Sequence, residues 1–453
     1  MKKIKGKKAL FLYGCSGLGV NMLTLLMGTY LCSALIVGGF DDKDIGSWTF
    51  ANQDLVVAAL WAVLVFVAKA LDGIIDLPFA LLLDRIKSKF GRRKLGLLIG
   101  WVPMVISFEL FNFPLTPNES VLNTVYLGVM LCLFYSFYTL TMLTYYATFS
   151  EVCETERDTV FLSNVKSVCD VIYFILGFAL VPLFVNMGAN VKIVALCFLP
   201  LSLTMAIPMF MLKEKNNKDE ELSVSDQPTI KESFKYSFMN KNFIYWMLTL
   251  SVVTIGLQLF TGGVNELFSS LQLNQTIIMA ASFAPVPLTI ILYNKVVNKK
   301  GLGFGYRYVL SLFGTGMLVL LSLYILRINQ DKVFGNMELS KINLVLTILA
   351  IIGGLIISFA IGAFFSVTYI VPTNLAKREF ERTGKTVNAM YFAIQGIFEG
   401  VAAGIGTGLI LVALKDNEVI YLLPVVILIC TVIAFIMSLF FPKAISEIGK
   451  TQG

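Results

Sequence analysis

Residues 55–83, LVVAALWAVLVFVAKALDGIIDLPFALLL, decide how the rest of the chain is interpreted. The stretch is apolar over more than the roughly 20 residues of helix that cross a bilayer, yet it contains Lys69, Asp72 and Asp76. Each ionised group in such a segment costs about 2.5–3.5 kcal/mol on insertion scales, so it is normally kept for an ion or substrate path. Spacings of three and four residues place the three groups on one helix face. The stretch therefore predicts a transmembrane helix whose charged face lines a polar cavity.

A structural role is the alternative for these charges. Lys69 and Asp72 would then neutralise each other between packed helices, and Asp76 would reach water near the helix end. A structural pair needs one carboxylate and this helix carries two, so we favour the functional interpretation.

The composition extends the membrane assignment to the whole chain, because 57% of its 453 residues are hydrophobic and only 14% are charged. The first apolar run follows five lysines, as a signal peptide would, but it is too long and lacks a small-residue cleavage site. We therefore predict an all-α integral membrane protein with twelve transmembrane helices, near residues 9–38, 55–83, 95–114, 121–149, 165–185, 191–212, 243–265, 274–297, 309–328, 343–372, 389–415 and 419–442.

Lysine and arginine set the orientation, because positively charged loops stay in the cytoplasm. Of the 36 basic residues, about 29 fall in the termini and the loops on the same side, against about six in the opposite loops. We expect both termini to be cytoplasmic, in a multi-pass protein of the cell membrane. The net charge of +7 reflects these basic cytoplasmic loops. Aromatic residues are not interspersed among the loop charges, as they would be on a surface that binds nucleic acid.

Missing residue types disfavour several function classes. The chain has no histidine, which removes the usual ligands of haem and most ligand sets of zinc, and leaves no nucleophile–base–orienter set for an enzyme. Its seven cysteines are scattered, without a CxxC pair, and are expected to be small core residues. No complete phosphate-binding loop of the form Gly-x-x-x-x-Gly-Lys-Ser/Thr occurs, and the only extended soluble segment is the stretch of about 30 residues at 213–242, which is too small for an ATP-driven pump. We expect no catalytic residues, no metal site and no cofactor beyond a coupling cation.

A charged, proline-containing segment, KEKNNKDEELSVSDQP at residues 213–228, divides the chain near its middle. We predict a six-helix bundle at 1–212, a cytoplasmic linker at 213–242, and a second six-helix bundle with a short tail at 243–453. A basic glycine turn follows both the second and the eighth span. Two parallel six-helix repeats would have such similar turns at equivalent positions.

Three blocks of sequence carry a family resemblance: KALDGIIDLP with DR and KFGRR over residues 69–93, TYYATFSE at 144–151, and TGK with YFA over 383–393. They resemble the glycoside-pentoside-hexuronide:cation symporters, the melibiose-permease branch of the major facilitator superfamily. The resemblance covers nearly the whole chain in span number and loop order. It implies a transporter of twelve helices in two bundles that couples a sugar to a cation by alternating access.

The resemblance also implies roles for individual residues. Asp72 and Asp76 match the two carboxylates of the family's cation site on helix two. The positions expected to contact the solute are Asn21, Lys69, Tyr138, Met142, Tyr146, Lys166 and Gln395.

The chain departs from the family pattern at two informative positions. Met142 offers no ligand oxygen where the pattern has an aspartate, and Glu399 stands where the permease carries a lysine. A sodium site needs about five or six hard oxygens, so the loss of one carboxylate makes sodium coupling doubtful. A proton needs only a carboxylate that can bind and release it. We therefore expect proton coupling through Asp72 or Asp76, with Glu399 as a second route, and keep Na⁺ as the alternative cation.

Several of these residues also have structural interpretations. The tyrosines of helix four form a stripe suited to stacking on a pyranose, but they also fit a packed aromatic core with Tyr146 at the membrane interface. Glu399 could be a neutral, helix-bonded acid. Glu266 and Asp170 receive less weight, because each lies near the end of a predicted span.

The basic loop at residues 84–94 is expected to serve as a gate. In a transporter whose two bundles rock against each other, Asp84 and Arg92 can pair with the other half, or with acids such as Glu151, in one state only. Anchoring by the positive-inside rule is the alternative role for these charges.

The sequence thus predicts a monomeric secondary active transporter in contact with membrane lipid, which moves a sugar or glycoside together with a cation. One alternative is the same fold carrying another solute, such as an amphipathic lipid, because a fold does not determine its cargo. The other is a non-transporting membrane sensor or assembly protein, which would have little reason to keep both Asp72 and Asp76.

Overall fold

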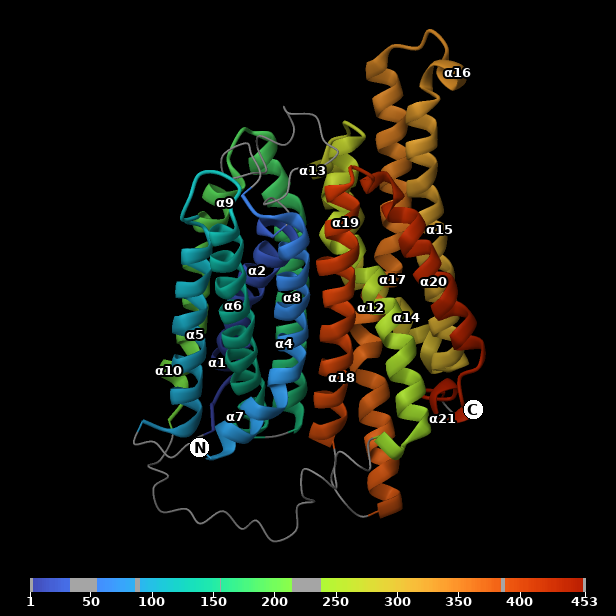
Figure 1. Ribbon diagram of the computed structural model, residues 1–453. Helices are drawn as coiled ribbons and strands as arrows, with labels where there is room; N and C mark the ends of the chain where they lie inside the picture. The colour runs from blue at the N-terminus through green and yellow to red at the C-terminus, as the bar shows by residue number, and fades with distance from the viewer. Residues whose placement is uncertain are drawn as a thin grey trace. The chain divides into compact units, whose positions relative to one another are not determined.

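The computed structural model describes residues 3–32, 55–85, 90–154, 156–213, 238–383 and 388–450. Over these ranges the chain is helical and contains no strand. Twelve of the helical segments are long and apolar enough to cross a membrane, which confirms the predicted all-α, twelve-span architecture (Figure 1).

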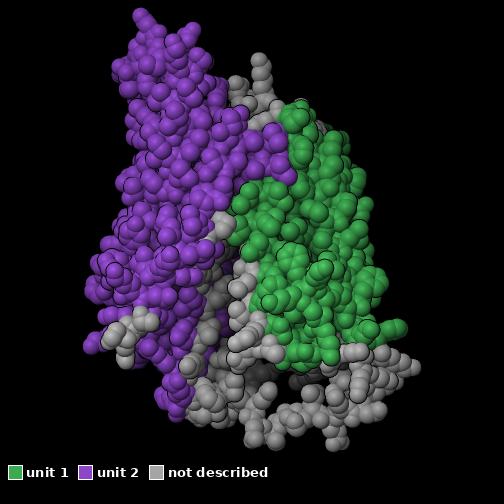
Figure 2. All heavy atoms as spheres, turned by 180° about the vertical axis from the view of Figure 1, so that it is seen from behind, with its two compact units in different colours: residues 1–36, 45–177, 184–225 green, residues 37–44, 178–183, 226–453 purple. Residues whose placement is uncertain are grey.

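The helices form two compact units, coloured separately in Figure 2. Unit 1 takes most of residues 1–225, and unit 2 takes most of residues 226–453. The first six candidate spans end at Met211 and the last six begin at Lys241. Most of the linker predicted at 213–242 lies outside the described residues.

Unit 1 contains the first half of the helices. They are α1 (Lys7–Gly14), η1 (Cys15–Gly17), α2 (Leu18–Leu25), η2 (Leu26–Leu31), α4 (Ala58–Arg85), α5 (Arg92–Phe111), α6 (Val121–Ala147), α7 (Phe149–Val152), α8 (Glu156–Asn186), α9 (Val191–Phe198), η4 (Leu199–Met205) and α10 (Ala206–Met211).

Helix α6 is the centre of packing in unit 1, where it contacts both α4 and α5. Small residues allow this close approach: a Cβ on Gly128 would lie 2.6 Å from Leu64, and one on Gly100 would lie 2.5 Å from the Thr141 hydroxyl. The Ser120 side chain caps the helix by accepting a hydrogen bond from the backbone N–H of Asn123. One face of α6 is thereby directed at α4, which carries the buried charges.

The first span is interrupted twice, which the sequence did not predict. A 3₁₀ turn, η1, separates α1 from α2, and a π-helical segment, η2, follows α2. Three glycines, Gly14, Gly17 and Gly19, fall at the first interruption, where glycine weakens a regular helix. The Thr204 hydroxyl of η4 accepts a hydrogen bond from the Gly19 N–H and lies 2.9 Å from the Ser16 carbonyl oxygen. The interruption is therefore held by the sixth span.

Gly19→Ala is expected to destabilise the protein, because the added Cβ would lie 1.8 Å from the Leu201 carbonyl oxygen, a backbone atom that no side-chain rotation can move. Overpacking of this kind costs about 1–3 kcal/mol. The matched control is Gly256→Ala on another helix, whose Cβ would make only an ordinary 3.5 Å contact with Cys430. Thermal unfolding in detergent should show a lower Tm for Gly19→Ala alone. Equal Tm values for the two variants would contradict the close packing at Gly19.

Unit 2 contains the remaining helices. They are α12 (Lys241–Ser270), α13 (Gln275–Phe283), α14 (Val286–Lys300), α15 (Leu302–Ile328), α16 (Gln330–Phe334), α17 (Leu339–Thr383), α18 (Asn388–Ala403), η5 (Gly404–Ile410), α19 (Leu411–Asp416), η6 (Ile420–Leu422), α20 (Leu423–Leu439) and α21 (Lys443–Ser446).

Two helices, α15 and α12, each pack against two others in unit 2. Helix α15 lies against both α17 and α20, and α12 lies against α20 and α18. The α15–α17 contact is again close, since a Cβ on Gly316 would lie 2.3 Å from Ile357. The span that contains α18 and α19 is interrupted by the π-helical segment η5, in the glycine-rich stretch Gly404-Ile-Gly406-Thr-Gly408.

Two helices extend well beyond their predicted spans. Helix α8 begins at Glu156, nine residues before the predicted start at 165, and α17 runs to Thr383, eleven residues past the predicted end at 372. Hydropathy detects only the apolar part of a helix, and both extensions are polar. This difference matters for Asp170, which lies well inside α8 and far from its first residue.

Candidate functional site

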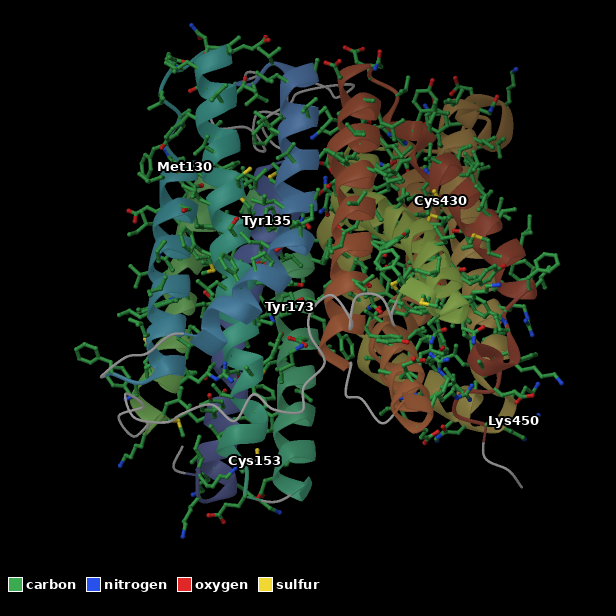
Figure 3. The ribbon with its side chains drawn as sticks, turned by 60° about the horizontal axis from the view of Figure 1, so that its bottom comes forward. Met130, Tyr135, Cys153, Tyr173, Cys430 and Lys450 are labelled. Atoms are coloured by element: carbon green, nitrogen blue, oxygen red, sulfur yellow. The ribbon has the colours of Figure 1, made fainter. Side chains whose placement is uncertain are left out.

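The charged residues of α4 find their partners on α6. The Thr139 hydroxyl donates a hydrogen bond to Asp72, and the Lys69 ammonium lies 3.9 Å from the centroid of the Tyr135 ring. Asp76 lies one turn further along α4 and is partly exposed. We call Lys69, Asp72, Asp76, Tyr135 and Thr139 the Lys69 cluster; Figure 3 labels Tyr135 among the side chains of unit 1.

When all three ionisable groups of the Lys69 cluster are charged, two carboxylates face one ammonium. The three charges act on one another, Lys69 with Asp72 and Asp72 with Asp76. An uncompensated negative charge in a poorly solvated site is costly, and a bound cation relieves it. The cluster therefore has the charge balance of a site for one cation.

A glycine makes room for the lysine and the tyrosine of this cluster. A Cβ on Gly28, in η2, would lie 3.0 Å from the Tyr135 hydroxyl and 3.8 Å from the Lys69 ammonium. Tyr135 is 1% exposed, and its hydroxyl has no hydrogen-bond partner among the described side chains and backbone groups. The first span thus approaches the Lys69 cluster at a point that only a small residue permits.

A second polar group in unit 1 links three spans. The Asn21 side chain donates a hydrogen bond of 3.0 Å to Asp170 on α8, and its amide oxygen accepts one of 3.2 Å from the Tyr138 hydroxyl on α6. Asp170 also forms an ion pair with Lys166, one turn earlier on α8. We call Asn21, Tyr138, Lys166 and Asp170 the Asn21 cluster.

The Asn21 cluster differs from the Lys69 cluster in charge, because its single ammonium and single carboxylate cancel. Asn21 is 6% exposed, whereas the side chains of Lys166 and Asp170 retain 19% and 28% exposure. The cluster thus presents an amide, a phenol, a carboxylate and an ammonium, which can all bond hydroxyl groups, while attracting no net charge.

Helix α6 connects the two clusters. Tyr138 belongs to the Asn21 cluster, and the next residue, Thr139, bonds Asp72 of the Lys69 cluster. Two consecutive residues of one helix thus contact the two clusters.

The remaining predicted residues of helix four have different environments. Met142 is 4% exposed, and its methyl carbon and the Asn21 amide nitrogen both lie near the position of a Cβ on Gly17, at 3.5 and 3.9 Å. Tyr145 is structural, because its hydroxyl donates to the Tyr13 and Gly14 carbonyl oxygens at the interruption of the first span. Tyr146 is 38% exposed, and its ring lies 5.1 Å from the Lys166 ammonium.

Asp170 is more central to the site than its place in the sequence indicates. It lies near the end of a predicted span, but α8 begins fourteen residues before it. The spacing of Lys166 and Asp170, at i and i+4 on one helix, was the available signal. Its bond to Asn21, 149 positions away in sequence, had no signal in a single sequence.

In unit 2, Gln395 and Glu399 lie on one face of α18 and are joined by a hydrogen bond. The Gln395 amide nitrogen lies 2.9 Å from the Thr368 carbonyl oxygen and 3.3 Å from Glu399 Oε1. Gln395 is 2% exposed, and its amide oxygen has no partner among the groups that the structure describes. Glu399 is half-buried. These two predicted residues are thus brought together.

A buried ion pair elsewhere in unit 2 was not predicted. Lys415 of α19 lies 3.3 Å from Glu266 Oε1 of α12, with side-chain exposures of 4% and 9%. It joins the end of the seventh span to the end of the eleventh. A buried pair of this kind fixes two helices relative to each other and is costly to break.

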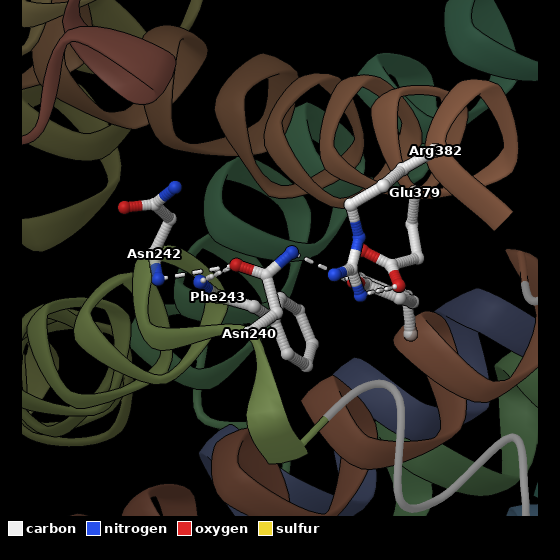
Figure 4. A network of polar contacts seen from close by, with 6 residues as sticks. Asn240, Asn242, Phe243, Glu379 and Arg382 are labelled. Carbon is white, nitrogen blue, oxygen red and sulfur yellow. Dashed lines mark hydrogen bonds and ion pairs between the residues drawn. The ribbon is translucent and has the colours of Figure 1, made fainter.

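A further polar network lies where α17 ends and α12 begins (Figure 4). Asn240 caps α12 by accepting hydrogen bonds from the N–H groups of Asn242 and Phe243, and its amide donates to the Tyr391 hydroxyl. Nearby, Glu379 and Arg382 form an ion pair of 2.6 Å on α17. The bond between Asn240 and Tyr391 ties the start of α12 to the start of α18.

The structure does not test the predicted gating role of Asp84, Arg92 and Glu151. Asp84 lies near the end of α4, Arg92 begins α5 and Glu151 lies in α7, but their side chains lie outside the described part of the structure. Their role as a gate stays a prediction.

Comparisons with known proteins agree with this architecture. Among solved structures, the nucleoside transporter NupG has a TM-score of 0.64 at 14% identity, with 96% of this chain and 98% of that one covered. A POT family transporter in complex with a thioalcohol-conjugated peptide reaches 0.56 at 13% identity, and a bacterial homolog of the human lysosomal transporter Spinster reaches 0.52 at 10%, each with 97% of both chains covered. At such identities these likenesses show the fold alone.

The curated proteins give no match. The family comparison gives one that covers most of the chain: residues 12–416 match the family described as MFS/sugar transport protein. The match includes every residue of both clusters of unit 1, together with Gln395 and Glu399 of unit 2. The chain therefore belongs to the MFS/sugar transport protein family, and it is a multi-pass membrane transporter, not an enzyme.

Proposed function

We propose that this transporter is a proton-coupled symporter of a neutral, polyhydroxylated solute such as a sugar or glycoside, acting as a monomer in the cell membrane. The observation that carries the proposal is the difference between the two clusters of unit 1. The Lys69 cluster has one negative charge in excess, and the Asn21 cluster has none. The former suits a cation and the latter suits an uncharged solute.

The groups of the Asn21 cluster support a sugar as the solute. Hydroxyl groups both donate and accept, and the cluster offers the Asp170 carboxylate and Asn21 carbonyl as acceptors and the Lys166 ammonium as a donor. The partly exposed ring of Tyr146 beside Lys166 supplies a face on which the apolar side of a pyranose can stack. Because the charges cancel, a neutral glycoside is favoured over a hexuronate.

Two features of the Lys69 cluster favour a proton over Na⁺. The Lys69 ammonium already lies close to the carboxylates, where it would repel a metal cation. Met142 supplies no oxygen, so the cluster's own oxygens, those of Asp72, Asp76, Thr139 and Tyr135, reach the number of a sodium site only if both carboxylates bind the ion through both of their oxygens. A proton needs neither a cage of oxygens nor an empty space.

The sequence resemblance at residues 69–93 supports placing the chain in the glycoside-pentoside-hexuronide:cation symporter branch. Glu399 would then act as an additional proton-binding group in unit 2, with Gln395 as its hydrogen-bond partner. The gating roles of Asp84, Arg92 and Glu151 belong to the same proposal.

Uptake into proteoliposomes tests the ion and the solute together. We expect a neutral glycoside to accumulate under an inward proton gradient, to lose accumulation when a protonophore is added, and to be indifferent to the replacement of sodium by choline. The panel should contain neutral glycosides, pentosides, hexuronates, nucleosides and a lysolipid, with protein-free liposomes as the control.

Each alternative has its own result in this assay. Stimulation by sodium without a proton gradient would overturn proton coupling. Transfer of the lysolipid in preference to every glycoside would identify a lipid carrier. Absence of transport for the whole panel, together with absence of binding, would favour a sensor or assembly protein.

A further inference from the structure

The eleventh span is wound in three parts, of which α18 and α19 are labelled in Figure 1. The α18 part carries Gln395 and Glu399, and the α19 part carries Lys415. Between them lies the π-helical segment η5, Gly404–Ile410. π-Helical turns are rare and occur frequently at functional sites. The contacts of the span on either side of η5 indicate what this segment does here.

Helix α12 holds the α19 end of the span. The Lys415 ammonium lies 3.3 Å from Glu266 Oε1, and both side chains are buried. One turn earlier, Leu411 packs over two glycines of α12, since a Cβ on Gly262 or Gly263 would lie 2.9 or 2.8 Å from one of its δ-carbons. Rotation of α19 would therefore break both an ion pair and a close-packed contact.

Helix α17 holds the α18 end. The Gln395 amide nitrogen donates a hydrogen bond of 2.9 Å to the Thr368 carbonyl oxygen. The amide oxygen of the same side chain is buried and has no partner among the groups that the structure describes. A buried acceptor without a partner is costly, so packing alone would not select this orientation. Another part of the span must therefore impose it.

The segment η5 joins these two fixed ends at a defined angle. A π-helical turn closes from i to i+5, so it holds one residue more than an α-helical turn. One residue corresponds to about 100° of rotation about the helix axis. If η5 were wound as an α-helix while Lys415 stayed against Glu266, Gln395 would turn about 100° away from Thr368.

We propose that η5 and the Glu266–Lys415 pair together position Glu399 for proton binding. This inference rests on the proposed function, which gives Glu399 that role. The ion pair fixes the α19 end of the span, and η5 sets the angle at which α18 presents Gln395 and Glu399. Glu266 and Lys415 are thus positioning residues, which act on Glu399 through the helix that separates them.

Deletion of Leu409 tests the winding without any solute. Leu409 lies in η5 and is 40% exposed, and its removal takes out the extra residue, so the segment should wind as an α-helix. A buried ion pair costs more to break than a neutral hydrogen bond. We therefore expect a structure of the variant to show the ion pair intact and α18 turned by about 100°. A retained π-helical segment, or a lost ion pair with α18 in place, would overturn the proposal.

The second measurement is the ratio of accumulation to counterflow exchange at saturating solute in proteoliposomes. Deletion of Leu409 and Glu266→Gln should each lower this ratio several-fold, because they misplace Glu399 and leave the Asn21 cluster of unit 1 unchanged. Leu409→Ala removes the same side chain but keeps the number of residues, so it should keep the wild-type ratio. The charge-reversed pair, Glu266→Lys with Lys415→Glu, should keep it as well.

The possible results are distinguishable. A parallel loss of accumulation and exchange in Glu266→Gln, without recovery in the charge-reversed pair, would show a purely structural ion pair and overturn the proposal. Should the deletion variant not fold, Glu266→Gln and the charge-reversed pair decide the question through the same ratio. Failure of the proposed function would appear as absence of proton-driven accumulation in the wild type, while the structure of the deletion variant would still report the winding.

Discussion

Asp76→Asn is expected to abolish concentrative uptake of the solute while counterflow exchange remains measurable. Accumulation requires net movement of the coupling cation, whereas exchange requires only solute binding and the conformational change. Asn is nearly the same size as Asp but cannot take up and release a proton. The variant removes one of the two carboxylates, so the Lys69 cluster becomes electrically balanced by Lys69 and Asp72 and no longer attracts a cation. The measurement is accumulation against counterflow in the same proteoliposomes.

Asp72→Asn should give the same separation of accumulation from exchange, with an added loss of stability. The Thr139 hydroxyl would keep a weaker acceptor, and Lys69 would lose its nearest carboxylate. Glu109→Gln is the matched control, because Glu109 is an exposed acid of α5. Retained accumulation in both Asp72→Asn and Asp76→Asn would remove the cation site from α4.

Asp170→Asn is expected to weaken solute binding by a factor of ten or more. Hydrogen bonds to charged groups contribute about 1.5–3 kcal/mol, and a change of about 1.4 kcal/mol is tenfold in Kd. The substitution also removes the carboxylate of the Lys166–Asp170 ion pair, which makes the charge of the Asn21 cluster more positive by one unit. Its preference should therefore shift from neutral glycosides toward hexuronates. Solute Kd values for both classes, measured by calorimetry in detergent, check this.

A compensating substitution makes the test sharper. Met142 follows Tyr138 by one turn of α6, and both its methyl carbon and Asn21 lie near Gly17, so Met142→Asp places a carboxylate near the Asn21 cluster from α6. In the Asp170→Asn background it should recover part of the lost affinity for neutral glycosides. Asp158→Asn, on the same helix about three turns away, serves as the control and should bind as the wild type does. A wild-type Kd in Asp170→Asn would show that Asp170 has only a packing role.

Features that lie within a single helix could be predicted from the sequence. Twelve apolar runs predicted twelve spans, and the spacing of Lys69, Asp72 and Asp76 predicted one charged face on α4. Asn21, Tyr138 and Lys166 were also named, through the family resemblance, and the structure brings them together. Periodicity and hydropathy act over a few helical turns, and these features lie within that range.

Pairings between distant segments left no such record. Asp170 with Asn21 and Glu266 with Lys415 are each joined across 149 positions. The interruptions of the first span could not be predicted for a related reason. A glycine-rich stretch tolerates 3₁₀ and π windings, but the Thr204 hydroxyl that supports one of them comes from the sixth span.

The length of α17 has a practical consequence for imaging this protein. A continuous helix of 45 residues is about 67 Å long, roughly twice the 30 Å of a hydrocarbon core, and residues 365–383 extend beyond its candidate span, Leu339–Phe364. A transporter of 50.1 kDa in a detergent micelle otherwise has few rigid features by which particle images can be aligned. The C-terminal end of α17, beyond its candidate span, is such a landmark. A nanobody raised against residues 374–383 there would be held rigidly and would mark the orientation of unit 2 in every particle.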